Sequence, residues 1–235
     1  MRGDDRVYSS YIASQIKSLQ KNSPKDKRSS NPFVTISRQT GTRGIAVAQD
    51  LCKYLQTRER RARCVWTVFG KELLAQVAQE HDLPETVLPY LSEDTASAIQ
   101  DMIEEALGLH PSHDLLVKKT NETILHLAQL GYAIIVGRAA NIVTGKMPGG
   151  VNIRLVCPLE KRIAHMQEVY GMKQKEAGEF VLQEDGKRRK YVKKYFAEDI
   201  EDPLLYDMVI NVGDFSRQEV VQTIGELVFS RHCQR

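Results

Sequence analysis

Apolar residues along this chain follow two patterns, which alternate from residue 33 onward. Short apolar runs, which are typical of buried strands, lie at 33–37, 62–69, 132–136, 151–157 and 208–212. Stretches with apolar residues three or four positions apart, which predict helices, lie at 45–56, 71–80 and, with a break near 108–111, at 83–130. Because strands alternate with helices, the pattern predicts an α/β fold with a parallel sheet.

The first 32 residues differ from the rest of the chain. Helical spacing predicts a helix within Val7–Leu19, with an apolar stripe at Tyr8, Ile12, Ile16 and Leu19. The polar run Lys21–Pro32 then predicts a linker. We therefore divide the chain into a helix and linker at 1–32 and a domain at 33–235. The helix would pack either on the domain or on a second copy of the chain, and the sequence leaves both open.

Composition indicates a globular protein. With 235 residues, of which 42% are hydrophobic, the chain can bury a sizeable core. A formal net charge of +3 is too small to indicate general nucleic-acid binding. The four cysteines form no C-x-x-C pair, which argues against a zinc site or a disulfide framework. Without a recognisable signal peptide or an apolar run long enough to span a membrane, we expect a cytoplasmic protein.

The segment Phe33–Leu51 combines a buried strand, a turn with two glycines and an amphipathic helix. This arrangement is typical of phosphate-binding loops, because glycine permits unusual φ angles and the N–H groups at a helix start attract anions. The glycines of the turn are Gly41 and Gly44. The segment departs from the common pattern G-x-x-x-x-G-K-[ST], because Arg38 replaces the first glycine and the lysine is missing. An ordinary connection between a strand and a helix is therefore the alternative.

An arginine follows the predicted strand at 132–136. Arg138 comes directly after Gly137, at the strand end where ligands of open α/β sheets bind. A planar guanidinium binds phosphate or carboxylate through two hydrogen bonds. A surface arginine after a tight turn would give the same pattern, so the position alone leaves both interpretations open.

A carboxylate precedes a cluster of basic residues near the end of the chain. On a helix, Asp185, Arg188 and Arg189 share one face, so that the carboxylate can orient an arginine while the cluster closes over a polyphosphate. A solvated helix face is the alternative, and RNA binding through Lys187–Lys194 is also open. Further on, Tyr206 lies at the entrance to the last predicted strand.

The order of these motifs resembles the cytidylate kinase-like family of P-loop nucleoside-monophosphate kinases. The segment SRQTGTRG at 37–44 is similar to the family's S-R-x-x-G-[ST]-x-G. Residues 69–74, FGKELL, are similar to its aromatic-Asp-Lys-Glu-Leu segment. Residues 158–163, PLEKRI, resemble the step from strand to helix before the family's lid.

The resemblance covers about 33–227 and implies a three-layer P-loop kinase fold with a parallel sheet and helices on both faces. It also implies a helical acceptor-binding insertion at 70–130 and a helical lid at 172–200. The implied activity is transfer of the γ-phosphoryl group of ATP to a nucleoside monophosphate, CMP or dCMP, with Mg²⁺ between the nucleotide phosphates.

For the donor, the resemblance implies a set of loop residues that hold the ATP phosphates: Ser37, Arg38, Gly41, Thr42, Arg43 and Gly44. Thr42 would also reach the metal, and Arg43 would supply the positive charge of the missing lysine. The loop departs from the family pattern, which has a small residue at Arg43 and polar residues at Ile45 and Ala46. A bulky arginine at this position would either bind phosphate or block it.

For the acceptor and the lid, the resemblance implies four further roles. Arg138 would bind the acceptor phosphate, and Asp185 would lie near the acceptor's sugar or orient the lid arginines. Arg188 and Arg189 would close on the transferring phosphoryl group. Val181 stands where related kinases often carry another arginine. These departures support a second hypothesis, a nucleotide-binding regulatory protein of the same fold with weak or no phosphoryl transfer.

Overall fold

The computed structural model describes residues 31–59, 65–70 and 113–233. Its five strands form one parallel sheet in the order β2-β3-β1-β4-β5. The strands are β1 (Phe33–Arg38), β2 (Thr67–Phe69), β3 (Ala133–Val136), β4 (Gly150–Val156) and β5 (Met208–Asn211). The helices are α2 (Gly44–Arg58), α5 (His113–Leu130), α6 (Ala140–Val143), α7 (Leu159–Tyr170), α8 (Gln174–Phe196) and α9 (Arg217–Cys233). A short 3₁₀ helix, η3 (Pro203–Leu205), precedes β5.

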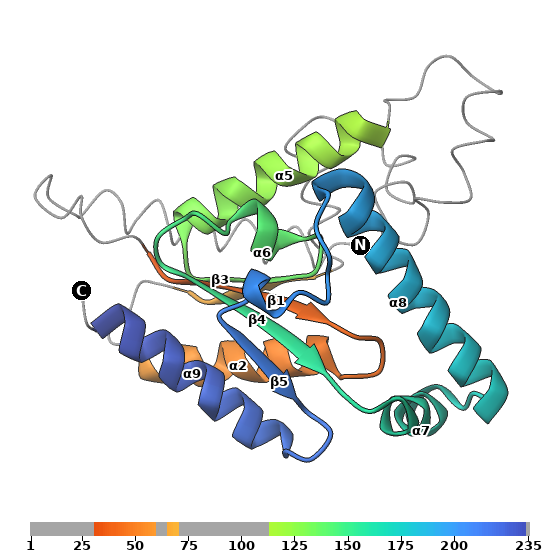
Figure 1. The fold of residues 1–235 in the computed structure, drawn as a ribbon. Helices are drawn as coiled ribbons and strands as arrows, with labels where there is room; N and C mark the ends of the chain where they lie inside the picture. The colour runs from red at the N-terminus through yellow and green to blue at the C-terminus, as the bar shows by residue number, and fades with distance from the viewer. Residues whose placement is uncertain (1–30, 60–64, 71–112, 234–235) are drawn as a thin grey trace, which may run out of the picture.

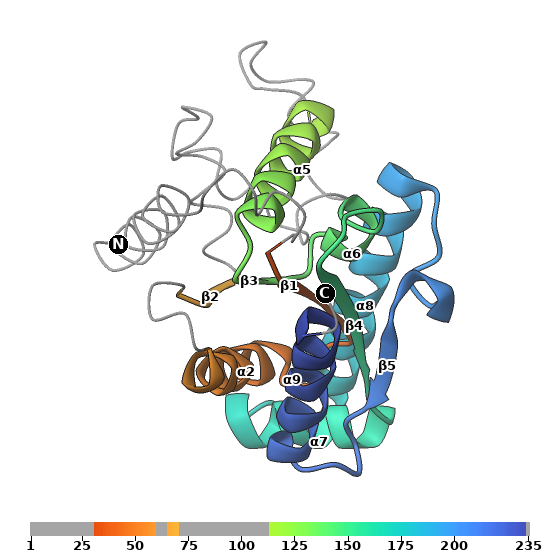
Figure 2. The ribbon, with the colours of Figure 1, turned by 90° about the vertical axis from the view of Figure 1, so that its left-hand side faces the viewer.

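Helices cover both faces of the sheet, with α2 and α9 on one side and α5 and α6 on the other (Figures 1 and 2). Successive residues of a strand face opposite sides, so alternate apolar positions build each layer. Val34 of β1 and Ile153 of β4 belong to the main core together with Leu51 of α2 and Ile224 of α9. The predicted α/β fold, with a parallel sheet between two layers of helices, is confirmed.

The opposite face of β1 and β4 is polar. In the parallel register, Thr35 pairs with Asn152 and Ser37 with Arg154. The Thr35 hydroxyl donates a hydrogen bond to the Asn152 side-chain oxygen at 2.7 Å. Arg154, in the middle of a strand that sequence analysis treated as apolar, is only 3% exposed. This polar face leads toward the carboxyl ends of the strands, where the candidate site lies.

Two helices that cross one another, α7 and α8, lie beyond the carboxyl ends of β1 and β4 (Figure 1). They pack through an apolar cluster that contains Met166 of α7 with Ala177 and Val181 of α8. Val181 is fully buried in this cluster. The position at which related kinases were expected to carry an arginine therefore serves, in this chain, to hold α8 against α7.

Most predicted elements are confirmed, with shifted ends. The strand expected at 62–69 is observed only as Thr67–Phe69, and α5 corresponds to the last part of the helical stretch expected at 83–130. The helices expected at 7–19 and 71–80 lie outside the described residues, so the proposed domain division stays a prediction. Of the helices that the structure describes, none has the length and apolar content needed to cross a membrane.

Candidate functional site

The loop between β1 and α2 takes a sharper path than the two glycines suggested. Gly41 has φ +85°, but the second left-handed residue is Arg43, with φ 59°, and not Gly44. Gly44 is the first residue of α2, and a Cβ atom there would lie 3.1 Å from Cγ of Arg38. Gly44 therefore makes room for the Arg38 side chain, and the expectation that it supplies an unusual φ angle was wrong.

Gly41 is required by packing as well as by its backbone angle. A Cβ atom at this position would lie 2.9 Å from both Cβ and the carbonyl oxygen of Arg162 on α7. The loop therefore touches α7 backbone to backbone, which only glycine allows.

We expect Gly41→Ala to lower the free energy of unfolding by about 2 kcal/mol or more, since a left-handed alanine alone costs roughly 1–2 kcal/mol. Urea unfolding of both chains measures the change. The matched control is Gly186→Ala in α8, where an added Cβ meets no atom within 4 Å. That variant should gain about 0.5–1 kcal/mol from helix propensity. Equal stability of Gly41→Ala and the unmodified chain would contradict the packing role.

The start of α2 is suited to bind an anion. The first N–H groups of an α-helix have no partner within the helix, and the helix dipole adds partial positive charge there. The first turn of α2 carries no acidic side chain that would compete for these groups. The structure thus has the strand, the tight turn and the open helix start that the sequence pattern predicts here.

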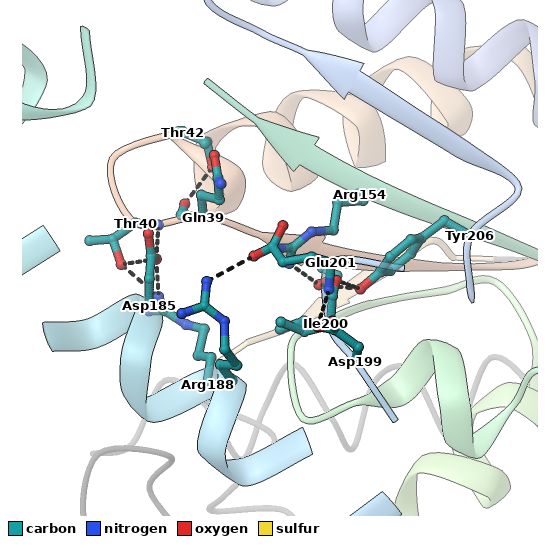
Figure 3. A network of polar contacts seen from close by, with 12 residues as sticks. Gln39, Thr40, Thr42, Arg154, Asp185, Arg188, Asp199, Ile200, Glu201 and Tyr206 are labelled. Atoms are coloured by element: carbon teal, nitrogen blue, oxygen red, sulfur yellow. Dashed lines mark hydrogen bonds and ion pairs between the residues drawn. The ribbon is translucent and has the colours of Figure 1, made fainter. Parts of the chain in front are cut away.

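Asp185 of α8 binds the loop directly (Figure 3). Its Oδ1 accepts hydrogen bonds from the backbone N–H of Thr40 at 2.7 Å and from the Thr40 hydroxyl at 2.9 Å. Its Oδ2 forms an ion pair with Nη1 of Arg162 at 2.5 Å. The side chains of Asp185 and Arg162 are 16% and 7% exposed. One partly buried carboxylate on α8 thus contacts both α7 and the loop.

The two arginines predicted to share a helix face have different surroundings. Nη1 of Arg188 donates to the Thr40 hydroxyl at 2.6 Å and lies 3.2 Å from Oδ1 of Asp185. Arg189 is 58% exposed, and its nearest acidic partner is Glu201, at 3.6 Å. Arg188 therefore lies at the loop, whereas Arg189 lies beside the segment that follows α8.

Arg43 reaches toward α7 in this structure. Its Nε donates to Nδ1 of His165 at 3.1 Å, and its Nη2 lies 3.4 Å from Oε2 of Glu168. Burial and the Arg43 guanidinium lower the pKa of His165, against the opposing charge of Glu168. The imidazole is therefore held in the neutral form, with Nδ1 as the acceptor.

Two cavities lie near the loop, one at the loop itself and one at the end of β1. The larger, of about 250 Å³, is lined by Gly41, Thr42 and Arg43, by α7 and by the segment between β5 and α9. The smaller, of about 20 Å³, lies between the sheet and α8. Its lining includes Ser37, Arg38, Arg138, Arg188 and Tyr206. Ser37 and Arg38, which the resemblance places at the donor phosphates, line the smaller cavity, whereas Asp185 and Arg189 line neither.

Arg138 occupies a strained turn after β3. Gly137, Arg138 and Ala139 have φ angles of 86°, 58° and 52°, three successive residues in the left-handed region. Each non-glycine residue there costs roughly 1–2 kcal/mol. The N–H of Gly137 donates to the carbonyl of Ile36 at 3.0 Å, which holds the turn against β1. In this turn conformation, Arg138 lines the smaller cavity.

Sequence analysis missed two arginines of the site. Arg162 was read only as part of a helix, and no feature of its local pattern indicates its contact with Asp185. Arg154 interrupts the apolar run at 151–157, and this charge inside a predicted strand was a usable signal. Its Nη1 donates to the Ser37 hydroxyl at 2.9 Å and its Nη2 to Oε1 of Glu201 at 2.8 Å.

The loop also has an oxygen suited to Mg²⁺. The Thr42 hydroxyl lines the larger cavity and donates its hydrogen to the carbonyl of Gln39 at 2.8 Å. This orientation leaves the lone pairs of the hydroxyl oxygen for a cation. Mg²⁺ prefers oxygen ligands and commonly takes only one or two from the protein, with phosphates and water completing its shell. The residues present therefore fit a magnesium nucleotide.

Several known proteins are similar to this chain at low sequence identity. An uncharacterized protein from Eubacterium ventriosum has a TM-score of 0.63 and 19% identity, over 85% of this chain and 99% of that chain. A shikimate kinase from Bacteroides thetaiotaomicron has a TM-score of 0.46 and 11% identity, over 84% of this chain and 98% of that chain. A curated uronate isomerase from Corynebacterium glutamicum is 23% identical over 137 residues, 58% of this chain. The match spans only 26% of that relative.

A family model extends over most of the described structure. The model of the cytidylate kinase-like family matches residues 33–214. This range includes the loop, the turn at Arg138, both helices of the α7 and α8 pair, and β5. The resemblance inferred from the motifs is confirmed, and the chain belongs to the cytidylate kinase-like family.

Proposed function

We propose that this protein transfers the γ-phosphoryl group of ATP to a nucleoside monophosphate, CMP or dCMP. The observation that carries the proposal is that one cavity is lined by the loop and a second by Ser37 and Arg38, the β1 residues that lead into it. Phosphoryl transfer requires a donor and an acceptor in line, on opposite sides of the group that moves. Membership of the cytidylate kinase-like family supports the same reaction.

The larger cavity is the proposed donor site. The N–H groups at the start of α2 would bind the ATP phosphates, and Lys161 and Arg217 add positive charge to the cavity lining. Bound Mg²⁺ would neutralise charge on the phosphate oxygens, with Thr42 as its protein ligand. Arg43 lines the same cavity and is half exposed. A rotation of its side chain away from His165 would bring the guanidinium to the phosphates in place of the missing lysine.

The smaller cavity is the proposed acceptor site. Arg38, Arg138 and Arg188 all line it, which suits a phosphate group with two negative charges. Its volume of about 20 Å³ is much too small for a nucleotide. Acceptor binding would therefore require α8 to move away from the sheet, which is the motion expected of a lid at 172–200. The contacts of Asp185 with Thr40 and Arg188 support its role in orienting a lid arginine.

Closure of α8 would complete the catalytic arrangement. Arg188 lies between the loop and the acceptor cavity, where its guanidinium would stabilise charge on the transferring phosphoryl group. Arg189 would contribute at longer range, because it is exposed and lies beside Glu201. Closure also expels water, which limits hydrolysis of ATP without transfer.

One observation favours the second hypothesis, a nucleotide-binding regulatory protein. Arg43, the substitute proposed for the lysine, is held by His165 and Glu168 on α7. If nucleotide binding does not release it, the loop binds phosphate without the charge that transfer requires. The chain would then bind ATP or CMP and form no ADP.

The deciding experiment measures ADP formation from ATP and Mg²⁺ with CMP, dCMP, UMP, AMP or GMP, beside a reaction without acceptor. We expect ADP to form in the presence of CMP or dCMP and to stay near background without an acceptor. Arg188→Ala, purified in the same way, is the control for contaminating kinases. Activity that belongs to this chain should be lower in the variant preparation. Nucleotide binding without acceptor-dependent ADP would overturn the kinase proposal and support the regulatory one.

A further inference from the structure

We propose that Arg154 is a positioning residue that fixes the Ser37 hydroxyl as a hydrogen-bond donor toward the phosphate group of the acceptor. The inference rests on the proposed function and adds a residue outside the loop and the lid. Arg154 lies in β4, directly beside Ser37 in the sheet register. Ser37 lines the smaller cavity, whereas Arg154 is not among the residues that line it.

The burial of Arg154 is unusual for a residue in the middle of a parallel strand. Moving a guanidinium out of water is costly unless its charge and its donors are matched. Arg154 meets this requirement through Glu201, at 2.8 Å, and through the ring of Tyr206, whose centre lies 5.7 Å from the guanidinium carbon. Its remaining described hydrogen bond goes to Ser37. The charge is therefore held at the base of the acceptor cavity.

The hydrogen of the Tyr206 hydroxyl already takes part in a hydrogen bond. This hydroxyl donates to the carbonyl of Ile200 at 2.8 Å, and its separation from Oγ of Ser37 is longer, 3.4 Å. Burial raises the pKa of Tyr206, against its bond with Ser37 and the charge of Arg154, so the hydroxyl keeps its hydrogen near neutral pH. Tyr206 therefore cannot also serve as a strong donor to Ser37.

These contacts determine what Ser37 can offer a ligand. A serine hydroxyl has one hydrogen to donate and two lone pairs to accept with. The guanidinium of Arg154 occupies a lone pair of Ser37, and the Tyr206 oxygen lies beside it. The Ser37 hydrogen is then free to turn into the cavity once an acceptor oxygen arrives there. Ser37 thus becomes a donor, and its contact with a positive charge strengthens that donation.

Three further side chains at the cavity are donors of hydrogen bonds. Arg38, Arg138 and Arg188 carry guanidinium groups, which donate hydrogen bonds and accept none. A pocket lined by such donors favours a group rich in acceptor oxygens, such as a phosphomonoester dianion. A ligand that lacks the phosphate would offer these donors fewer acceptor oxygens. We therefore expect Arg154 to act on the phosphate of the acceptor and not on its base.

The test is calorimetric binding of CMP, cytidine and ATP to four proteins: the unmodified chain, Ser37→Ala, Arg154→Met and the double variant. Each single change should weaken CMP binding by about tenfold or more, the usual effect of losing a hydrogen bond to a charged group. The double variant should be little weaker than Ser37→Ala alone, because Arg154 acts through Ser37. Cytidine and ATP binding should change by less than about threefold in all variants.

Lys190→Met is the matched control, because it removes one positive charge from an exposed position of α8. It should leave CMP binding unchanged. If Arg154→Met fails to fold, Ser37→Ala alone still tests the donor role through the difference between CMP and cytidine. A merely structural role of Arg154 would weaken ATP and CMP binding alike, or add to the effect of Ser37→Ala, and either result would overturn the proposal. If the unmodified chain binds none of the five nucleoside monophosphates, both this inference and the proposed reaction are contradicted. If Ser37→Ala retains CMP binding, only the inference is contradicted.

Discussion

Replacing Arg188 with alanine should lower kcat for phosphoryl transfer by roughly 30- to 1000-fold, which corresponds to about 2–4 kcal/mol of transition-state stabilisation. Arg188 lies at the boundary between the loop and the acceptor cavity, with Nη1 2.6 Å from the Thr40 hydroxyl. A guanidinium there would interact most strongly with the charge that develops during transfer. We therefore expect kcat and kcat/KM for ATP to fall by similar factors.

Steady-state ADP formation at varied ATP and CMP measures the effect. Lys190→Ala, an exposed basic residue of the same helix, is the control and should retain full activity. Arg189→Ala should have a smaller effect than Arg188→Ala, because Arg189 is exposed and contacts Glu201 only at 3.6 Å. An unchanged kcat in Arg188→Ala would remove this residue from the transfer step. A change in nucleotide affinity alone would instead favour the regulatory hypothesis.

Asp185→Ala should be the most destabilising single change in the α7 and α8 pair, with a loss of about 3–5 kcal/mol in the free energy of unfolding. Asp185 accepts two hydrogen bonds from Thr40 and forms ion pairs with Arg162 and Arg188. The Arg162 side chain is almost completely buried. Without the carboxylate, a buried positive charge loses its acidic partner, and this loss dominates the expected cost.

Urea unfolding at neutral pH measures this change. Glu179→Ala is the matched control, since Glu179 is an exposed carboxylate on the same helix and should shift the stability by less than about 0.5 kcal/mol. Asp185→Asn separates charge from shape, because the amide still accepts a hydrogen bond but cannot pair with two arginines. A loss below about 1 kcal/mol in Asp185→Ala would show that water replaces the carboxylate.

The predictions from the sequence are correct for elements whose burial can be recognised from their own residues. The apolar runs at 33–37 and 132–136 are observed as β1 and β3 with ends shifted by one residue. β3 is apolar and buried at every position, as expected for a strand covered on both faces, so its pattern can be read without its neighbours. The run at 151–157 is observed as β4, although Arg154 within it pairs with Ser37 and Glu201 and is not part of the apolar core.

Backbone angles at the loop were harder to predict. Glycine tolerates left-handed angles, but a glycine in the sequence does not show that its position requires one. Gly41 does require one, whereas Gly44 is helical and Arg43 takes the left-handed angle instead. The contacts of Arg43 with α7 accompany this angle, and α7 begins more than a hundred residues later.

By itself, the sequence determined the alternation of strands and helices, the strand, turn and helix at 33–51 and the spacing that places Asp185 and Arg188 on one helix face. Only the tertiary structure decided which partner each charged side chain meets. It assigned Arg188 to the loop and Arg189 to Glu201, and it buried Arg154 and Arg162 against Ser37 and Asp185. The reason is physical: helix and strand periodicity depends on nearby residues, whereas a long guanidinium side chain takes its partners from whatever distant segments the packing brings within reach.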